Sequence, residues 1–191
     1  MTVPPELTYL ALFFGYALEG TSLPVPAELL SLGSGHYISL GLVSFWGSVV
    51  AAAAGNVTGS LVAYAAGWLT GRSIRRGSPL ARLLGVNRAA LERAEPWLRR
   101  FGGLTTFAAR WIGFIRPAAL MGAGAMRVRL PAFLFFGALG SFTYCLLWQY
   151  LGWRFAPLAR HLLSGHVWEG VAALVLSIAA GVATLRLIGR Q

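Results

Sequence analysis

Lysine and aspartate are absent from this sequence: all sixteen basic residues are arginine and all six acidic residues are glutamate. Charged residues make up only 12% of the 191 residues and hydrophobic residues 57%, a balance far from that of soluble globular domains. The single cysteine, Cys145, excludes an internal disulfide. No arginine precedes Arg72, so the basic region of a cleavable signal peptide is missing, and we expect the start of the chain to be retained. The low content of charged residues and the high content of hydrophobic residues predict an all-α integral membrane protein with a single membrane domain, residues 1–191.

The apolar runs differ in length and in how often proline, glycine or a charge interrupts them. A helix needs about 20 apolar residues to cross a bilayer, and Leu7–Leu18 is shorter, so it is interfacial, tilted or continuous with the next segment. We expect an N-terminal helix and a first re-entrant hairpin over 7–35, a span over 39–71, a basic amphipathic segment over 72–103, a second re-entrant hairpin over 104–126, and spans over 130–153 and 167–185. The fold class is therefore two opposed re-entrant helical hairpins plus about three to four spanning helices.

Proline and glycine interrupt both hairpin segments in the same order. The residues that we expect to shape the hairpins are Pro24, Pro26, Gly33 and Gly35 in the first and Pro117, Gly122 and Gly124 in the second. In each half a span follows and ends in a tyrosine with Gly-Trp, in "YAAGW" and "YLGW". The halves therefore form a weak internal repeat, which is inverted if the hairpins enter from opposite faces. Paired interrupted segments of this kind are typical of a transporter's binding site.

The arginines predict an orientation in the membrane. Eight of them fall between Arg72 and Arg100, which favours contact with anionic lipids of the cytoplasmic leaflet, and no nucleic-acid module accompanies them. If this segment and the C-terminus are cytoplasmic, twelve arginines lie inside and two outside, as the positive-inside rule favours. We expect a multi-pass protein of the cytoplasmic (inner) membrane, with no cofactor, no metal and no nucleic-acid partner. An oligomer is compatible with the sequence.

Four charges stand inside the broken apolar segments: Glu19, Glu28, Arg110 and Arg116. A charge at the bilayer centre costs about 2.5–3.5 kcal/mol on insertion scales, so we expect Glu19 or Glu28 to lie within ion-pair reach of Arg110 or Arg116, across a polar cavity. Arginine can bind a phosphate with two parallel hydrogen bonds, and a desolvated glutamate can bind a proton. The sequence thus predicts an anion-binding pair opposite a proton-sensitive pair. The alternative is two static salt bridges that fix the tips of the hairpins.

Two signatures resemble those of the DedA membrane family. "GYALEGTSLPVPAELLSLGSG" is similar to the first, with Glu19 and Glu28 at its paired acids, and "FAARWIGFIRPAALMGAGAMRVRLPAF" to the second, with Arg110 and Arg116 at its paired arginines. The resemblance covers roughly residues 15–155. Ala27 stands where the family usually has glycine, and Gly113 where it usually has proline.

The resemblance implies opposed re-entrant hairpins, dependence on the proton motive force, and movement of lipids between leaflets. In bacterial members the implied cargo is undecaprenyl phosphate. A phospholipid scramblase of broader specificity is the alternative.

A lipid phosphatase is a further alternative, from a different functional class. Such enzymes use Arg-Pro, Ser-Gly-His and a later charged cluster, and this chain has Arg116-Pro117 and "SGH" at Ser34 and Ser164. The upstream lysine of that motif and an aspartate to orient a histidine are both missing. We therefore expect a transporter rather than an enzyme. Asn56, in the middle of an apolar span, is interpreted as a hydrogen-bonding residue between helices.

Overall fold

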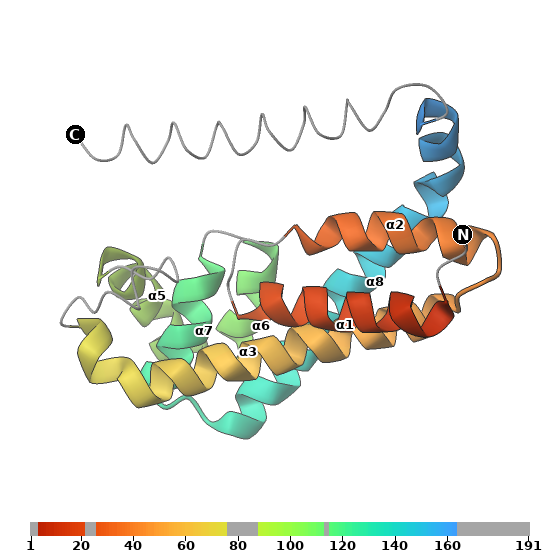
Figure 1. The fold of residues 1–191 in the computed structure, drawn as a ribbon. Helices are drawn as coiled ribbons and strands as arrows, with labels where there is room; N and C mark the ends of the chain where they lie inside the picture. The colour runs from red at the N-terminus through yellow and green to blue at the C-terminus, as the bar shows by residue number, and fades with distance from the viewer. Residues whose placement is uncertain (1–3, 22–25, 76–87, 113–114, 164–191) are drawn as a thin grey trace.

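The computed structural model describes residues 4–21, 26–75, 88–112 and 115–163, and within them the chain forms seven α-helices and no strand (Figure 1). The helices are α1 (Pro5–Gly20), α2 (Ala27–Ser39), α3 (Phe45–Arg75), α5 (Arg88–Phe101), α6 (Leu104–Trp111), α7 (Arg116–Ala125) and α8 (Leu130–Leu163). The expected all-α architecture is confirmed for these residues. The predicted span over 167–185 and residues 76–87 of the arginine-rich segment over 72–103 lie outside them.

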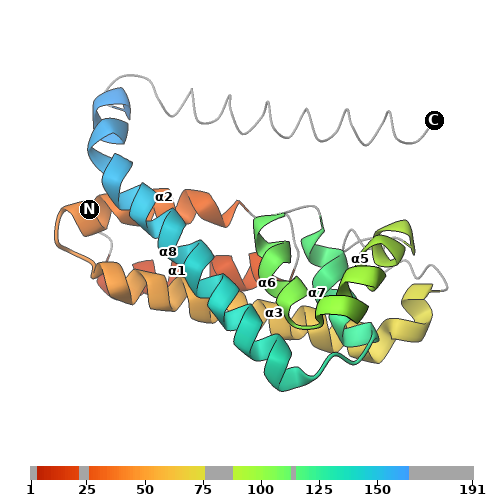
Figure 2. The ribbon, with the colours of Figure 1, turned by 180° about the vertical axis from the view of Figure 1, so that it is seen from behind.

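Two long helices form the frame of the molecule. Residues Phe45–Thr70 of α3 and Leu130–Ala156 of α8 are each long and apolar enough to cross a membrane. The predicted spans over 39–71 and 130–153 correspond to these helices, although α3 begins at Phe45 and α8 continues to Leu163. Seen from behind, α8 runs diagonally across the other helices (Figure 2). The two long helices contact each other directly.

Two pairs of short helices pack against this frame. Helix α1 lies along α3, and α2 lies against α8 and returns beside α1; α6 packs against α8 and α7 against α3. The four short helices contain 16, 13, 8 and 10 residues, fewer than the about 20 that a spanning helix needs.

The first hairpin segment differs from the expected one at its glycines. The sequence predicts a hairpin within 7–35 that is interrupted at Gly33 and Gly35, but α2 runs without interruption from Ala27 to Ser39 and passes through both. Helix α1 ends at Gly20, and α1 and α2 contact each other. Proline is well tolerated at the beginning of a helix, so Pro26 precedes α2 without breaking it.

Glycines bring the helix backbones close together. A Cβ atom on Gly20 would lie 2.6 Å from the carbonyl oxygen of Asn56, so α1 and α3 touch through their backbones there. Gly67 of α3 and Gly124 of α7 likewise face the backbone of the other helix. Small residues at helix interfaces are typical of membrane proteins, where close van der Waals packing drives association.

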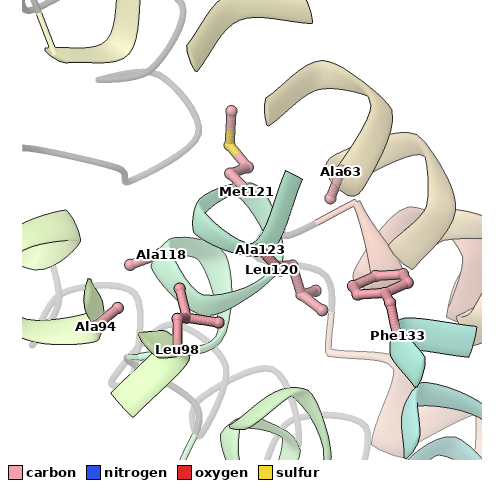
Figure 3. Packing of buried hydrophobic residues seen from close by; sticks show 8 residues of the cluster. All are labelled: Ala63, Ala94, Leu98, Ala118, Leu120, Met121, Ala123 and Phe133. Atoms are coloured by element: carbon pink, nitrogen blue, oxygen red, sulfur yellow. The ribbon is translucent and has the colours of Figure 1, made fainter. Parts of the chain in front are cut away.

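Helix α7 is the centre of one apolar core (Figure 3). Its buried residues Leu120 and Met121 pack in a cluster with Phe133 of α8 and Leu98 of α5. Helix α5 turns Ala94 and Leu98 toward this core and exposes Trp97 together with Arg93, Arg99 and Arg100. Gly102 then adopts a positive φ of 53° and connects α5 to α6. This packing fixes α7, and with it the position of its first residue, Arg116.

Candidate functional site

Glu19 and Arg116 form a buried ion pair between the two helical pairs. Glu19 is in the last turn of α1 and Arg116 is the first residue of α7. Arg116 Nη1 donates a hydrogen bond to Glu19 Oε1, and each side chain is only 8% exposed. The expectation that an acid of the first hairpin segment would pair with an arginine of the second is confirmed for these two residues.

Arg110 is buried as well, but its partner is not an acid. It is 3% exposed, and its Nη2 donates a hydrogen bond to Ser60 Oγ of α3 at 2.9 Å. Its side chain passes over Gly140 of α8, where a Cβ atom would come within 3.0 Å of Arg110 Cδ. Glycine at this position therefore makes room for the guanidinium stem.

Both guanidinium groups retain unused donors. Among the described residues, Nε and Nη1 of Arg110 and Nε and Nη2 of Arg116 are buried and have no hydrogen-bond partner. More than 90% of buried polar groups in proteins do have one, and an unpaired buried donor costs about 1–3 kcal/mol. Four such nitrogens from two arginines are donors that the oxygens of an anion could satisfy.

Glu28 has a different partner from Glu19. It lies in the first turn of α2, is half-buried, and accepts a hydrogen bond from Tyr144 Oη of α8 at 2.6 Å. The ring of Tyr144 contacts Trp111 at 5.9 Å and Trp148 at 6.2 Å between ring centroids, both edge to face. Glu28 is thus joined through Tyr144 to an aromatic cluster, whereas Glu19 contacts Arg116 and Asn56 of α3.

The four charges nevertheless form one electrostatic cluster. Glu19 is within interaction range of Glu28 and Arg110 as well as Arg116, and the two arginines repel each other. When both acids are ionised, the two glutamates and the two arginines together have a net charge of zero. Protonation of either acid leaves a net positive charge that an anion can neutralise.

Polar residues of the long helices complete the site, and the sequence did not assign them to it. Asn56 and Ser60 of α3 and Ser141 of α8 are fully buried and hydrogen-bonded to the charged residues or to each other. The interpretation of Asn56 as a hydrogen-bonding residue between helices is confirmed. The signal for Ser60 is its spacing, since it follows Asn56 by four residues and lies on the same face of the helix.

The residues expected to shape the hairpins occupy several different positions. Pro26 immediately precedes α2, Pro117 is in the first turn of α7, and Pro24 lies outside the described residues. Within α2, Gly33 is exposed, and Gly35 packs against Gly152 of α8. Gly122 and Gly124 are buried near the end of α7. The role of this set in shaping the hairpins stays a prediction.

The "SGH" fragment of α2 is not arranged as a catalytic group. Ser34 Oγ shares its single proton between two acceptors, the carbonyl oxygen of Ser31 and Gln149 Oε1 of α8. A nucleophilic serine or histidine requires a neighbouring general base or an orienting acid, and these contacts supply neither. The second "SGH", at Ser164, lies outside the described residues. In the part of the chain that the structure describes, no group of three His, Cys, Asp or Glu side chains could hold a metal ion.

Comparison with known sequences identifies the family. The VTT domain matches residues 25–154, which include both arginines, Glu28 and the two long helices up to Arg154. The chain belongs to the VTT-domain family, the family named DedA. It is therefore a membrane protein of this family.

Curated relatives match the chain at low identity. An alkaline phosphatase-like protein of Lactococcus lactis subsp. cremoris is 26% identical over 185 residues, covering 94% of this chain and 81% of the relative. A membrane protein of Synechocystis sp. is 29% identical over 143 residues, or 73% of this chain and 63% of the relative. Undecaprenyl phosphate transporter A of Bacillus subtilis is 25% identical over 128 residues, or 67% of this chain and 64% of the relative. No solved structure matches the chain significantly.

Proposed function

We propose that this protein moves a phosphate-headed lipid, foremost undecaprenyl phosphate, between the leaflets of the cytoplasmic membrane, and that the proton motive force drives the movement. The observation that carries the proposal is the pair of buried arginines, whose four unpartnered nitrogens lie where the two helical pairs meet. Guanidinium groups bind phosphate with paired, charge-assisted hydrogen bonds. The name of the Bacillus subtilis relative supports this choice of cargo.

Protonation of the acids would control access to the arginines. When Glu19 is ionised, it occupies Nη1 of Arg116, and the head group of the lipid meets a site that is already neutralised. When a proton neutralises Glu19, Arg116 is released and can join Arg110 in binding the phosphate. Glu28 is the second acid of the mechanism, and Tyr144 holds it beside the cluster. Proton binding and phosphate binding thus favour each other.

Short helices would let the head group reach both leaflets. We propose that α1 with α2, and α6 with α7, are re-entrant hairpins that enter the bilayer from opposite faces, related by an inverted repeat. None of the four is long enough to cross alone, and Glu19 and Arg116 meet at their tips. Only the head group needs to cross the thin barrier between them, while the hydrocarbon tail stays in the lipid.

Helix α5 supports the proposed orientation, with the 72–103 segment on the cytoplasmic leaflet. Trp97 and Phe101 are exposed beside the face that packs on α7, and the Arg100 guanidinium lies 5.3 Å from the centre of the Phe101 ring. Exposed aromatic rings next to arginines are typical of helices that lie on an anionic membrane surface.

A phospholipid scramblase of broader specificity is the second candidate function, because the same guanidinium groups could bind the phosphate of a phosphodiester lipid. A lipid phosphatase is disfavoured by the contacts of Ser34, although two relatives are named alkaline phosphatase-like.

The test of phosphate recognition compares two lipids with the same tail. The purified full-length protein in detergent should bind undecaprenyl phosphate and not undecaprenol, which has a hydroxyl group in place of the phosphate. Replacing Arg110 and Arg116 together by glutamine should abolish the difference, whereas Arg154→Gln, on an exposed part of α8, is the matched control and should keep it. Equal binding of the two lipids by the wild-type protein would contradict the proposal.

A further inference from the structure

Asn56 and Ser60 connect the spanning helix α3 to both helical pairs at once. They are four residues apart on one face of α3, and their exposed fractions are 0% and 1%. Asn56 contacts Glu19, which comes from α1, and Ser60 contacts Arg110, which comes from α6. One helical turn of α3 therefore contacts both an acid of the first signature, Glu19, and an arginine of the second, Arg110.

The hydroxyl group of Ser60 is fixed by two hydrogen bonds. It accepts from Arg110 Nη2 at 2.9 Å and donates to the carbonyl oxygen of Asn56 at 2.7 Å. Because its proton points to the backbone, its lone pair points to the guanidinium. Arg110 is thereby anchored through Nη2, and its other two nitrogens, Nε and Nη1, have no hydrogen-bond partner among the described residues.

The amide group of Asn56 is oriented from the opposite side. Ser141 Oγ of α8 shares its single proton between the carbonyl oxygen of Gly137 at 2.9 Å and Asn56 Oδ1 at 3.2 Å. The amide oxygen therefore faces α8, and the amide nitrogen faces Glu19, whose Oε2 it approaches at 3.4 Å. The backbones of α1 and α3 touch at Gly20 and Asn56, which leaves little room for the amide to turn. Glu19 is thus held at one oxygen by Asn56 and at the other by Arg116.

We propose that Asn56 and Ser60 are positioning residues of the lipid-phosphate site: Ser60 presents Arg110 to the phosphate, and Asn56 orients Glu19 toward Arg116. This inference rests on the proposed function. Because the two residues act on different groups, their replacement has different consequences. Loss of Ser60 weakens phosphate binding at every pH, whereas loss of Asn56 changes the pH at which Glu19 releases Arg116.

The direction of the pH shift expected on loss of Asn56 follows from the hydrogen bond that Asn56 donates to Glu19. An amide N–H that donates to a carboxylate favours its ionised form, so Glu19 without Asn56 binds a proton at higher pH. The other charged and titratable groups within reach of Glu19 are Arg116 of α7, Arg110 of α6, Glu28 of α2, Tyr16 of its own helix, and Tyr144 and Cys145 of α8. None of them is altered by the replacement of Asn56.

The experiment measures undecaprenyl phosphate binding and flux from pH 5 to 8 with the full-length protein in liposomes. Ser60→Ala should weaken binding about tenfold without moving the pH of half-maximal flux, and Ser60→Thr, which keeps the hydroxyl group, should restore it. Ser48→Ala is the matched control, because Ser48 is a buried serine of the same helix whose hydroxyl bonds only to the carbonyl oxygen of Ser44.

Asn56→Leu should raise the pH of half-maximal flux by about half to one unit, while binding at pH 5, where Glu19 is protonated, stays close to that of the wild type. Ser141→Ala, which removes the donor that orients the amide, should move the profile in the same direction by less. This second variant keeps the test decisive if Asn56→Leu fails to fold.

Two outcomes would overturn the inference. If Ser60→Ala binds like Ser48→Ala, or if both Asn56→Leu and Ser141→Ala keep the wild-type pH profile, the residues only pack the helices together. If the wild-type protein itself binds no undecaprenyl phosphate, the proposed function fails, and the inference fails with it. The wild-type measurement therefore separates the two failures.

Discussion

Replacing Glu19 by glutamine should destabilise the ligand-free protein more than the same replacement at Glu28. Glu19 is buried and paired with Arg116, and breaking a buried ion pair by removing one partner costs about 3–5 kcal/mol. The amide oxygen of glutamine can still accept one hydrogen bond, so we expect about 3 kcal/mol for Glu19→Gln. At Glu28, which is half-buried, glutamine keeps the hydrogen bond from Tyr144, and the loss should be about 1 kcal/mol.

Thermal denaturation of the purified proteins in detergent measures this difference. For a chain of this size, a loss of 1 kcal/mol lowers Tm by about 2–4 °C. Glu19→Gln should therefore melt about 6–12 °C below the wild type, and Glu28→Gln about 2–4 °C below it. The Glu28 variant is the matched control for the removal of one negative charge from the same cluster.

Added lipid should then reverse most of the loss at Glu19. At a concentration of 100 times Kd, a ligand that binds only the folded protein stabilises it by about 2.7 kcal/mol. Undecaprenyl phosphate should raise Tm more for Glu19→Gln than for the wild type, because no carboxylate then competes for Arg116. Two results would contradict this competition for Arg116: a Tm of Glu19→Gln equal to that of the wild type, or stabilisation of Glu19→Gln by undecaprenol as large as that by undecaprenyl phosphate.

Three further predictions concern the arginines, the space around them and the topology. Arg116→Lys should weaken undecaprenyl phosphate binding about tenfold, because a single ammonium cannot form the paired hydrogen bonds of guanidinium; unchanged affinity in a binding titration would contradict this. Gly140→Ala should also weaken binding, since the added methyl group displaces the stem of Arg110, and wild-type affinity would show that Arg110 is not a phosphate ligand. On a Cys145→Ala background, Ser78→Cys and Ser164→Cys should react with a membrane-impermeant maleimide from opposite sides, and labelling from the same side would refute the proposed orientation.

The pairing of charges could be predicted from the sequence because the physical constraint is severe. Charged residues in apolar segments must find a partner, and the two broken segments, 7–35 and 104–126, hold only two acids and two arginines. The structure pairs Glu19 with Arg116. It gives Arg110 a serine and Glu28 a tyrosine, because neutral hydroxyl groups can satisfy part of a buried charge. Composition offers many such hydroxyl groups and does not single one out.

The helices were predictable in type but less so in their boundaries. The long apolar runs indicated the spans that became α3 and α8. The short run at Leu7–Leu18 remained ambiguous, because nothing in its composition shows that it forms one arm of a pair with α2. Gly33 and Gly35 suggested a break, yet α2 continues through both, since Gly35 permits contact with Gly152 of α8. A glycine that serves close packing and one that serves a turn look the same in a sequence.

Proton-driven transport of a phosphate-headed lipid can be measured in liposomes under an imposed proton gradient. The full-length protein is reconstituted, and the transfer of undecaprenyl phosphate and of an ordinary phospholipid between leaflets is followed with and without the gradient. We predict that undecaprenyl phosphate moves faster than the phospholipid, that the gradient accelerates it, and that replacing Arg110 and Arg116 together by glutamine abolishes the movement. Equal, gradient-independent movement of both lipids would instead support the scramblase, and no movement of either lipid would contradict lipid transport by this protein.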